Sequence, residues 1–88
     1  MYRITSITKD GVQRTDGRYP SRVGSVVEIL SLDIGKPMEL QYVLDANGNE
    51  KTSYLYTGKI VKIESEIGLN KIVVTTSNSV YTLERFAH

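Results

Sequence analysis

The sequence contains no cysteine and no tryptophan, and its only histidine, His88, is the last residue. Without cysteine the chain forms neither disulfides nor thiolate metal sites, which fits a reducing compartment. A histidine-based nucleophile system needs an imidazole that other groups hold in place, and chain ends rarely provide that setting. These absences exclude cysteine-based zinc sites and argue against a histidine-dependent hydrolase.

Long apolar stretches are missing as well. Runs such as residues 72–74 are far too short to span a bilayer, and the first residues, MYRITSITKDG, lack the apolar segment of a secretion signal. No glycine-rich motif for cradling phosphates is present. We therefore expect a soluble, cytoplasmic protein with no membrane segment, no cofactor and no enzymatic activity.

Length and charge indicate one small domain with a mildly basic start. The 88 residues leave room for a single core, and the formal net charge of +1 creates no strong field for nucleic acid or anionic lipid. Residues 1–22 nevertheless carry five basic and two acidic side chains, against six basic and eight acidic ones in the remainder. We interpret residues 1–22 as a basic strand and loop segment, and residues 23–86 as the core of a small β-barrel.

Apolar residues recur with period two, and no segment has the period of an amphipathic helix. The clearest case is MELQYVL, which predicts a strand with one buried face formed by Met38, Leu40, Tyr42 and Leu44. A type I′ turn at Asn47-Gly48 would follow it. Turn signals near Gly68 and at residues 77–78 separate two later strands, and residues 1–8 and 22–32 supply others. The total is five or six short strands and no helix.

The segment TSYLYTGKIVKIE predicts one long strand. Its alternation predicts one face with Leu55, Val61 and Ile63 and an opposite face with Tyr54, Tyr56, Ile60 and Lys62. Glycine within a strand usually marks a bulge or a sharp bend. We expect Gly58 to bend the strand so that it serves two sheets.

This spacing of strands resembles the SH3-like small-barrel architecture over residues 22–86. The matching features are the run at 23–32, the loop to Met38, the hairpin through Asn47-Gly48, the bend at Gly58 and the final hairpin. The resemblance implies a small all-β barrel. The alternation by itself fits either a closed barrel or a two-sheet sandwich of antiparallel strands. The segment GKIVKIE also resembles the glycine-led strand of KOW modules, which implies contact with RNA or the ribosome.

One segment has part of the spacing of a metal site. DANGNE places Asp45, Asn47 and Asn49 as in a calcium loop. Glu50 and Tyr56 then stand where that loop needs glycine and glutamate. We interpret the segment as a tight turn and expect no metal.

The first candidate binding segment is RTDGRYPSR. Its candidate contact residues are Arg14, Arg18, Tyr19 and Arg22. We expect Gly17 and Pro20 to keep the segment out of a helix. Arginine suits phosphates and carboxylates, and tyrosine stacks on bases or fills protein pockets. The alternative is a solvated connection whose arginines pair with nearby acids.

The second candidate is the outer face of the long strand, with Tyr54, Tyr56 and Lys62. Exposed aromatic side chains on a strand are typical of protein contact surfaces. The alternative is that one or both tyrosines cover a barrel end or a cross-strand neighbour. Tyr42 is predicted to lie in the core, and Tyr81 fits either setting.

Three functions follow as hypotheses. The leading one is a binding module or a small stand-alone inhibitor or adaptor that contacts a protein partner, of the kind that phages and other mobile elements carry. The second is a KOW-like nucleic-acid-binding barrel that uses Arg14, Arg18 and Arg22, with help from Lys59, Lys62 and Lys71. The third is a structural subunit of a homo-oligomer.

Overall fold

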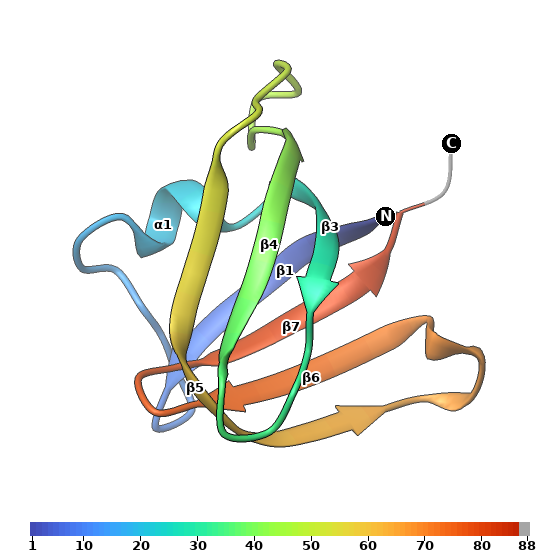
Figure 1. Cartoon of the computed structure of the whole chain (residues 1–88). Coiled ribbons are helices and arrows are strands. Elements are labelled where there is room, and N and C mark those ends of the chain that lie inside the picture. The colour runs from blue at the N-terminus through green and yellow to red at the C-terminus, as the bar shows by residue number, and fades with distance from the viewer. Residues whose placement is uncertain (87–88) are drawn as a thin grey trace.

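Six antiparallel strands close into a barrel in the computed structural model, which describes residues 1–86 (Figure 1). Their order around the barrel is β1 (Tyr2–Lys9), β3 (Val26–Ser31), β4 (Pro37–Leu44), β5 (Tyr54–Ser65), β6 (Lys71–Thr76) and β7 (Val80–Arg85). Pairing of β7 with β1 completes the closure. The predicted all-β class is confirmed, and the closed form is consistent with an SH3-like barrel. His88 lies outside the described residues.

The basic segment at the start of the chain supplies part of the barrel wall. Strand β1 pairs with β3 on one side and with β7 on the other, and a short strand β2 (Val12–Gln13) adds a hairpin to its end. Ile4 and Ile7 on β1 are fully buried. Residues 1–22 therefore contribute a strand and core side chains in addition to a loop.

The core fills the interior of the barrel with side chains from all six strands. Met38, Leu40 and Tyr42 alternate inward along β4, as their spacing predicts. Leu44, predicted on the same buried face, is only half-buried at the end of the strand and lies outside the core cluster. The other members of the core cluster are Ile4, Ile7, Val27, Leu55, Ile60, Ile72, Val74, Tyr81 and Leu83. Tyr42 was predicted in the core and is buried there, and Tyr81 joins it.

Strand β5 bends at Gly58 and belongs to two walls, as predicted. Its first half pairs with β4, for example through Tyr56 and Glu39, and its second half pairs with β6, for example through Ile63 and Val74. A β-carbon at Gly58 would collide with Ser77 Oγ and lie 2.9 Å from Asn78 Nδ2. Glycine therefore leaves room there for the Ser77 and Asn78 side chains of the turn between β6 and β7.

In the second half of β5 the predicted faces are wrong for Ile60 and Val61. Ile63 packs against the core and Lys62 is exposed, as predicted. Ile60 is 1% exposed and lies in the core, whereas Val61 is 63% exposed. The pairing of β5 with β6 shifts register between Ile60 and Lys62, and its pairing with β4 shifts before Glu39. Each bulge changes which side of the strand faces inward, so simple alternation from Leu55 fails.

The turn after β4 also differs from the prediction. Gly48 has a positive φ of 83°, but Asn47 does not, so the turn is not type I′. The N–H of Gly48 donates to the carbonyl of Asp45, and Asp45 Oδ1 accepts from the N–H groups of Asn47 and Asn49. These bonds form a wider loop that continues to residue 53, and they hold the pKa of Asp45 below its usual value.

Residues Tyr19–Arg22 form a one-turn helix, α1, although Gly17 and Pro20 were predicted to keep this segment out of a helix. Pro20 lies in its first turn, where a missing N–H costs no hydrogen bond. A second short helix, the 3₁₀ turn η1 (Ile67–Leu69), connects β5 to β6. Within residues 1–86 no helix has both the length and the apolar character to cross a membrane.

Candidate binding surface

Arg14 connects the N-terminal loop to the turn between β6 and β7. Its guanidinium donates to both carboxylate oxygens of Asp16, at 2.7 and 3.1 Å, which lowers the pKa of that carboxyl. It also donates to the carbonyl of Asn78 and to Ser79 Oγ, each at 2.9 Å. With these donors engaged, Arg14 has little capacity left for a partner.

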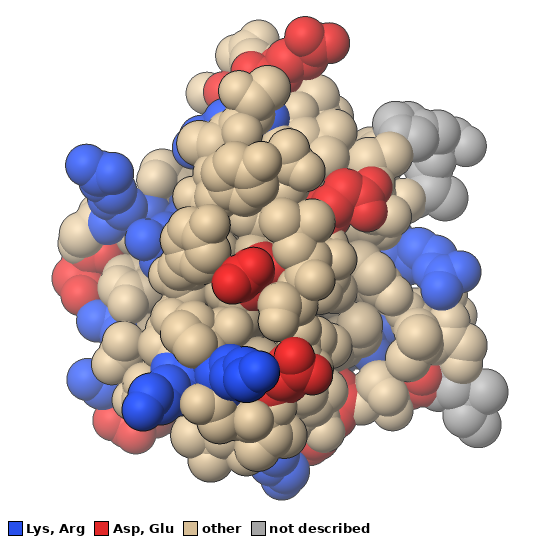
Figure 2. All heavy atoms as spheres, viewed as in Figure 1, with Lys and Arg blue, Asp and Glu red and all other residues tan. Residues whose placement is uncertain are grey.

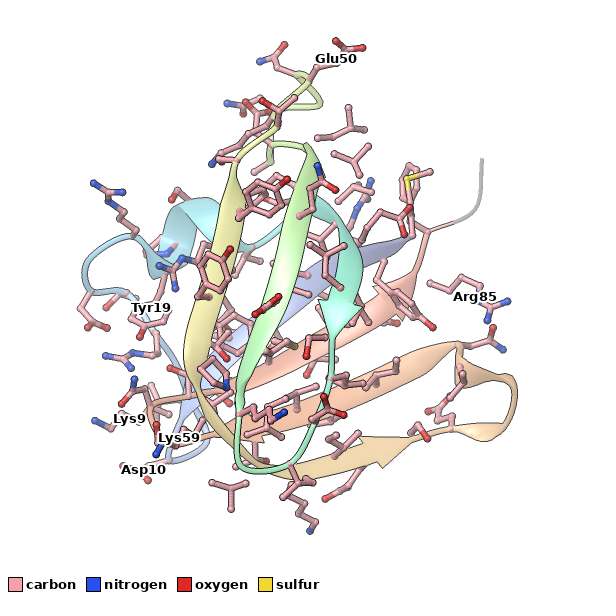
Figure 3. The ribbon with its side chains drawn as sticks, in the orientation of Figure 1. Lys9, Asp10, Tyr19, Glu50, Lys59 and Arg85 are labelled. Atoms are coloured by element: carbon pink, nitrogen blue, oxygen red, sulfur yellow. The ribbon has the colours of Figure 1, made fainter. Side chains whose placement is uncertain are left out.

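Tyr19 holds helix α1 against the barrel. The guanidinium carbons of Arg14 and Arg22 lie 4.0 and 4.8 Å from the centre of its ring, which is cation–π distance. The side chain is half-buried and packs against the core cluster. Figure 3 shows Tyr19 at the side of the barrel, beneath α1. Its role in this arrangement is packing.

Arg22 reaches from α1 to two buried phenols. Its Nη1 donates to the hydroxyl of Tyr81 at 3.0 Å. Burial raises the pKa of Tyr42 and of Tyr81, and the charge of Arg22 opposes the shift in both. The phenols stay neutral at neutral pH, so they leave the charge of Arg22 uncompensated.

A groove of about 190 Å³ lies between α1, the loop before β5 and the start of β5. It is lined by Arg18, Ser21, Arg22, Tyr42, Lys51, Ser53, Tyr54 and Leu55, and is called the basic groove below. Lys51 Nζ sits 4.0 Å from the centre of the Tyr42 ring. Within residues 1–86, neither Lys51 nor the two arginines of the groove form an ion pair with a carboxylate.

The first half of β5 presents two tyrosines to solvent. Tyr54 is 54% and Tyr56 is 62% exposed, and their cross-strand partners on β4 are Gln41 and Glu39. Strand β3, on the other side of β4, adds Leu30, which is 50% exposed. These five residues are called the tyrosine face below. Figure 2 shows a largely uncharged surface in the middle of the view, over β4 and β5, with isolated acidic groups.

Lys62 lies apart from the two tyrosines. It is on the half of β5 that pairs with β6, and its Nζ forms a 2.7 Å ion pair with Glu64. The hydrogen bond to Glu64 raises the pKa of Lys62. Both side chains remain more than half exposed. The structure therefore separates Lys62 from the tyrosine face with which it was predicted.

Sequence reasoning placed Arg18, Arg22 and Tyr54 in two separate candidates, and the fold brings them into one groove. It missed Lys51, because only the long loop after β4 carries that side chain back beside α1. Within the described part of the chain, no three histidine, cysteine or acidic side chains are placed to hold a metal ion. Comparisons with protein-family models, curated proteins and solved structures find no significant match for this chain.

Proposed function

We propose that this protein is a non-enzymatic binding module of SH3-like type, a small inhibitor or adaptor that grips a protein partner. The contact surface consists of the tyrosine face and the basic groove. The observation that carries the proposal is the position of Tyr54, which belongs to the tyrosine face and also lines the groove. The two regions therefore form one continuous surface of aromatic and basic side chains.

The composition of this surface matches that of protein interfaces. Tyrosine and arginine are enriched among the residues that dominate binding energy. Tyr54 and Tyr56 lie on β5, which is hydrogen-bonded to β4. The basic groove lies between β5 and α1. Side chains on such a rigid support lose little conformational entropy when a partner binds.

A nucleic-acid-binding barrel is the second candidate, and the basic groove favours it. Arg18 and Lys51 could contact phosphates beside Tyr54, on which a base could stack. Against it stands Arg14, the third arginine of the original candidate, which is bound to Asp16 and Ser79. The groove offers only Arg18, Arg22 and Lys51 as cations, and the net charge of +1 adds no strong field to attract a polyanion.

A homo-oligomer is the third candidate, and it would use a different surface. Ile34 is 59% and Val61 63% exposed, and a backbone bridge between Ile34 and Ile60 brings the two segments together. An apolar pair of this kind is small compared with the interfaces of stable dimers. Sedimentation at high concentration tests it, because a monomer would remove this candidate.

The deciding experiment is affinity capture from lysate of the native host, with and without nuclease, using three forms of the protein. We expect the wild type to retain a protein partner after nuclease treatment. Tyr56→Ala should lose that partner, and Val61→Ala, an exposed apolar change on the other half of β5, should keep it. The proposal would be contradicted if the partner is lost after nuclease treatment, or if Tyr56→Ala retains the partner as well as the wild type does.

A further inference from the structure

We infer that the basic groove is a carboxylate-binding subsite, which takes an aspartate or glutamate side chain from an extended segment of the protein partner. The inference deepens the proposed function and rests on it. It identifies the chemistry of the ligand from the charges of the groove.

The cations of the groove are held in place before any ligand binds. Arg22 is fixed by its bond to Tyr81 and by its contact with the Tyr19 ring, and Lys51 rests over Tyr42. A guanidinium has five N–H donors, and Tyr81 uses one of those of Arg22. The remaining donors suit a carboxylate, which accepts two parallel hydrogen bonds from an arginine. Such a site needs little reorganisation to bind.

The rim of the groove adds a third charge and a neutral donor. Arg18 is exposed at the edge, next to Ser21, whose hydroxyl donates to the Arg18 carbonyl at 2.7 Å. Ser53 contributes a hydroxyl from the side of β5. No aspartate or glutamate is among the lining residues of the groove. Its charge is therefore complementary to an acidic side chain.

The size of the groove favours a side chain over a nucleic-acid strand. Its 190 Å³ is smaller than the roughly 300–1,000 Å³ of pockets that enclose small molecules. A phosphate backbone continuing past Lys51 would next meet Glu50, which lines the adjoining hollow and projects from the loop in Figure 3. Like charge there disfavours a polyanion that continues into the adjoining hollow more than a single carboxylate that stays in the basic groove.

The adjoining hollow indicates what accompanies the acidic residue. It measures about 480 Å³, shares Tyr42 and Lys51 with the basic groove, and is also lined by Val43 and Leu44. These half-buried apolar side chains suit an aliphatic neighbour in the ligand. The geometry points to a segment in which an acidic residue stands beside an apolar one.

The probe is a blocked pentapeptide, acetyl-Gly-Leu-Glu-Leu-Gly-amide, titrated into the ¹⁵N-labelled protein and followed by amide chemical shifts. We expect shifts at Lys51, Ser53 and Tyr54, and about tenfold weaker binding of the peptide with glutamine in place of glutamate. Lys51→Gln should weaken binding by a similar factor. Lys59→Gln is the matched control, since Lys59 is an exposed lysine at the bend of β5, away from the groove (Figure 3).

Equal binding of the glutamate and glutamine peptides, or shifts confined to other residues, would overturn the inference. A twelve-residue oligothymidylate is titrated in parallel, and tighter, strongly salt-dependent binding of it in the groove would replace the carboxylate by phosphate. The proposed function has a separate test: it fails if no protein partner is captured whose binding depends on Tyr56. If the protein captures a partner but binds the glutamate and glutamine peptides equally well, only the carboxylate subsite is refuted.

Discussion

The two halves of β5 belong to one strand but present different chemistry. The first half carries Tyr54 and Tyr56 outward and buries Leu55, and it pairs with β4. The second half, which pairs with β6, turns Val61 and the Lys62–Glu64 ion pair outward. One bend at Gly58 and two register shifts therefore give a single strand two surfaces, of which we assign binding to the first.

The comparison also explains why only one half obeys simple alternation. Along the first half, successive side chains keep their sides, and both tyrosines are exposed, which is one of the two settings that the sequence left open. Near Gly58 the strand leaves β4 and joins β6. The first bulge reverses the sides of Ile60 and Val61, and the second returns Ile63 to the inward side. Ile60 and Val61 are both β-branched and apolar, yet Ile60 is buried and Val61 is exposed.

The largest expected effect distinguishes Ile60 from its neighbour. Ile60→Ala should destabilise the fold by about 2–5 kcal/mol, because it removes buried methyl groups and leaves a cavity. Val61→Ala should change the free energy of unfolding by less than about 0.5 kcal/mol, as exposed substitutions do. Urea denaturation of both variants measures the difference. Reversed costs would mean that alternation continues unbroken from Leu55, and both bulges would then be refuted.

The next effect is at the bend itself. Gly58→Ala should cost about 1–3 kcal/mol, because the added methyl group collides with the turn between β6 and β7. The backbone of Gly58 is not in the positive-φ region, so the cost comes from the neighbouring side chains. Ser77→Gly, which removes the colliding hydroxyl, should recover part of the stability in the double variant. Thermal unfolding of the single and double variants provides the measurement, and additive losses would argue against the contact.

A third prediction concerns binding and separates the two surfaces. Tyr56→Ala should weaken affinity for the captured partner by about tenfold or more, with an unfolding free energy within about 0.5 kcal/mol of wild type. Lys62→Ala should leave that affinity unchanged, since its side chain lies on the other half of β5. Calorimetric titration of the three proteins measures both. Equal losses would merge the two surfaces into one.

The smallest effect is that of the Lys62–Glu64 ion pair on stability. Glu64 raises the folded-state pKa of Lys62, so the stabilisation is complete below the unfolded-state pKa and is lost as pH rises through the folded-state value. Glu64→Gln removes it at every pH. The difference in melting temperature between wild type and variant should be small at neutral pH and low salt, and it should shrink at strongly alkaline pH. A difference that grows with pH would contradict this assignment.

Much of the candidate site could be predicted residue by residue, but its assembly could not. Tyr54 and Tyr56 could be placed on the face opposite Leu55 because the alternation in this part of the chain is regular, but the sequence left open whether another segment covers them. Arg14 and Arg22 could not be given their roles, since Asn78, Ser79 and Tyr81 are distant in the sequence. Through these long-range hydrogen bonds Arg14 joins the N-terminal loop to the turn between β6 and β7, whereas Arg22 is held at the basic groove.

What the sequence by itself determined is the all-β class, the approximate strands, most of the core and the positions of the turns. Alternation and turn chemistry act over a few residues, so they can be recognised without the fold. Only the tertiary structure decided the closure of β1 on β7, the inward side of β5 after its bend and the meeting of Lys51 with α1. These features depend on contacts between distant segments, where packing against the neighbouring strand outweighs the local pattern.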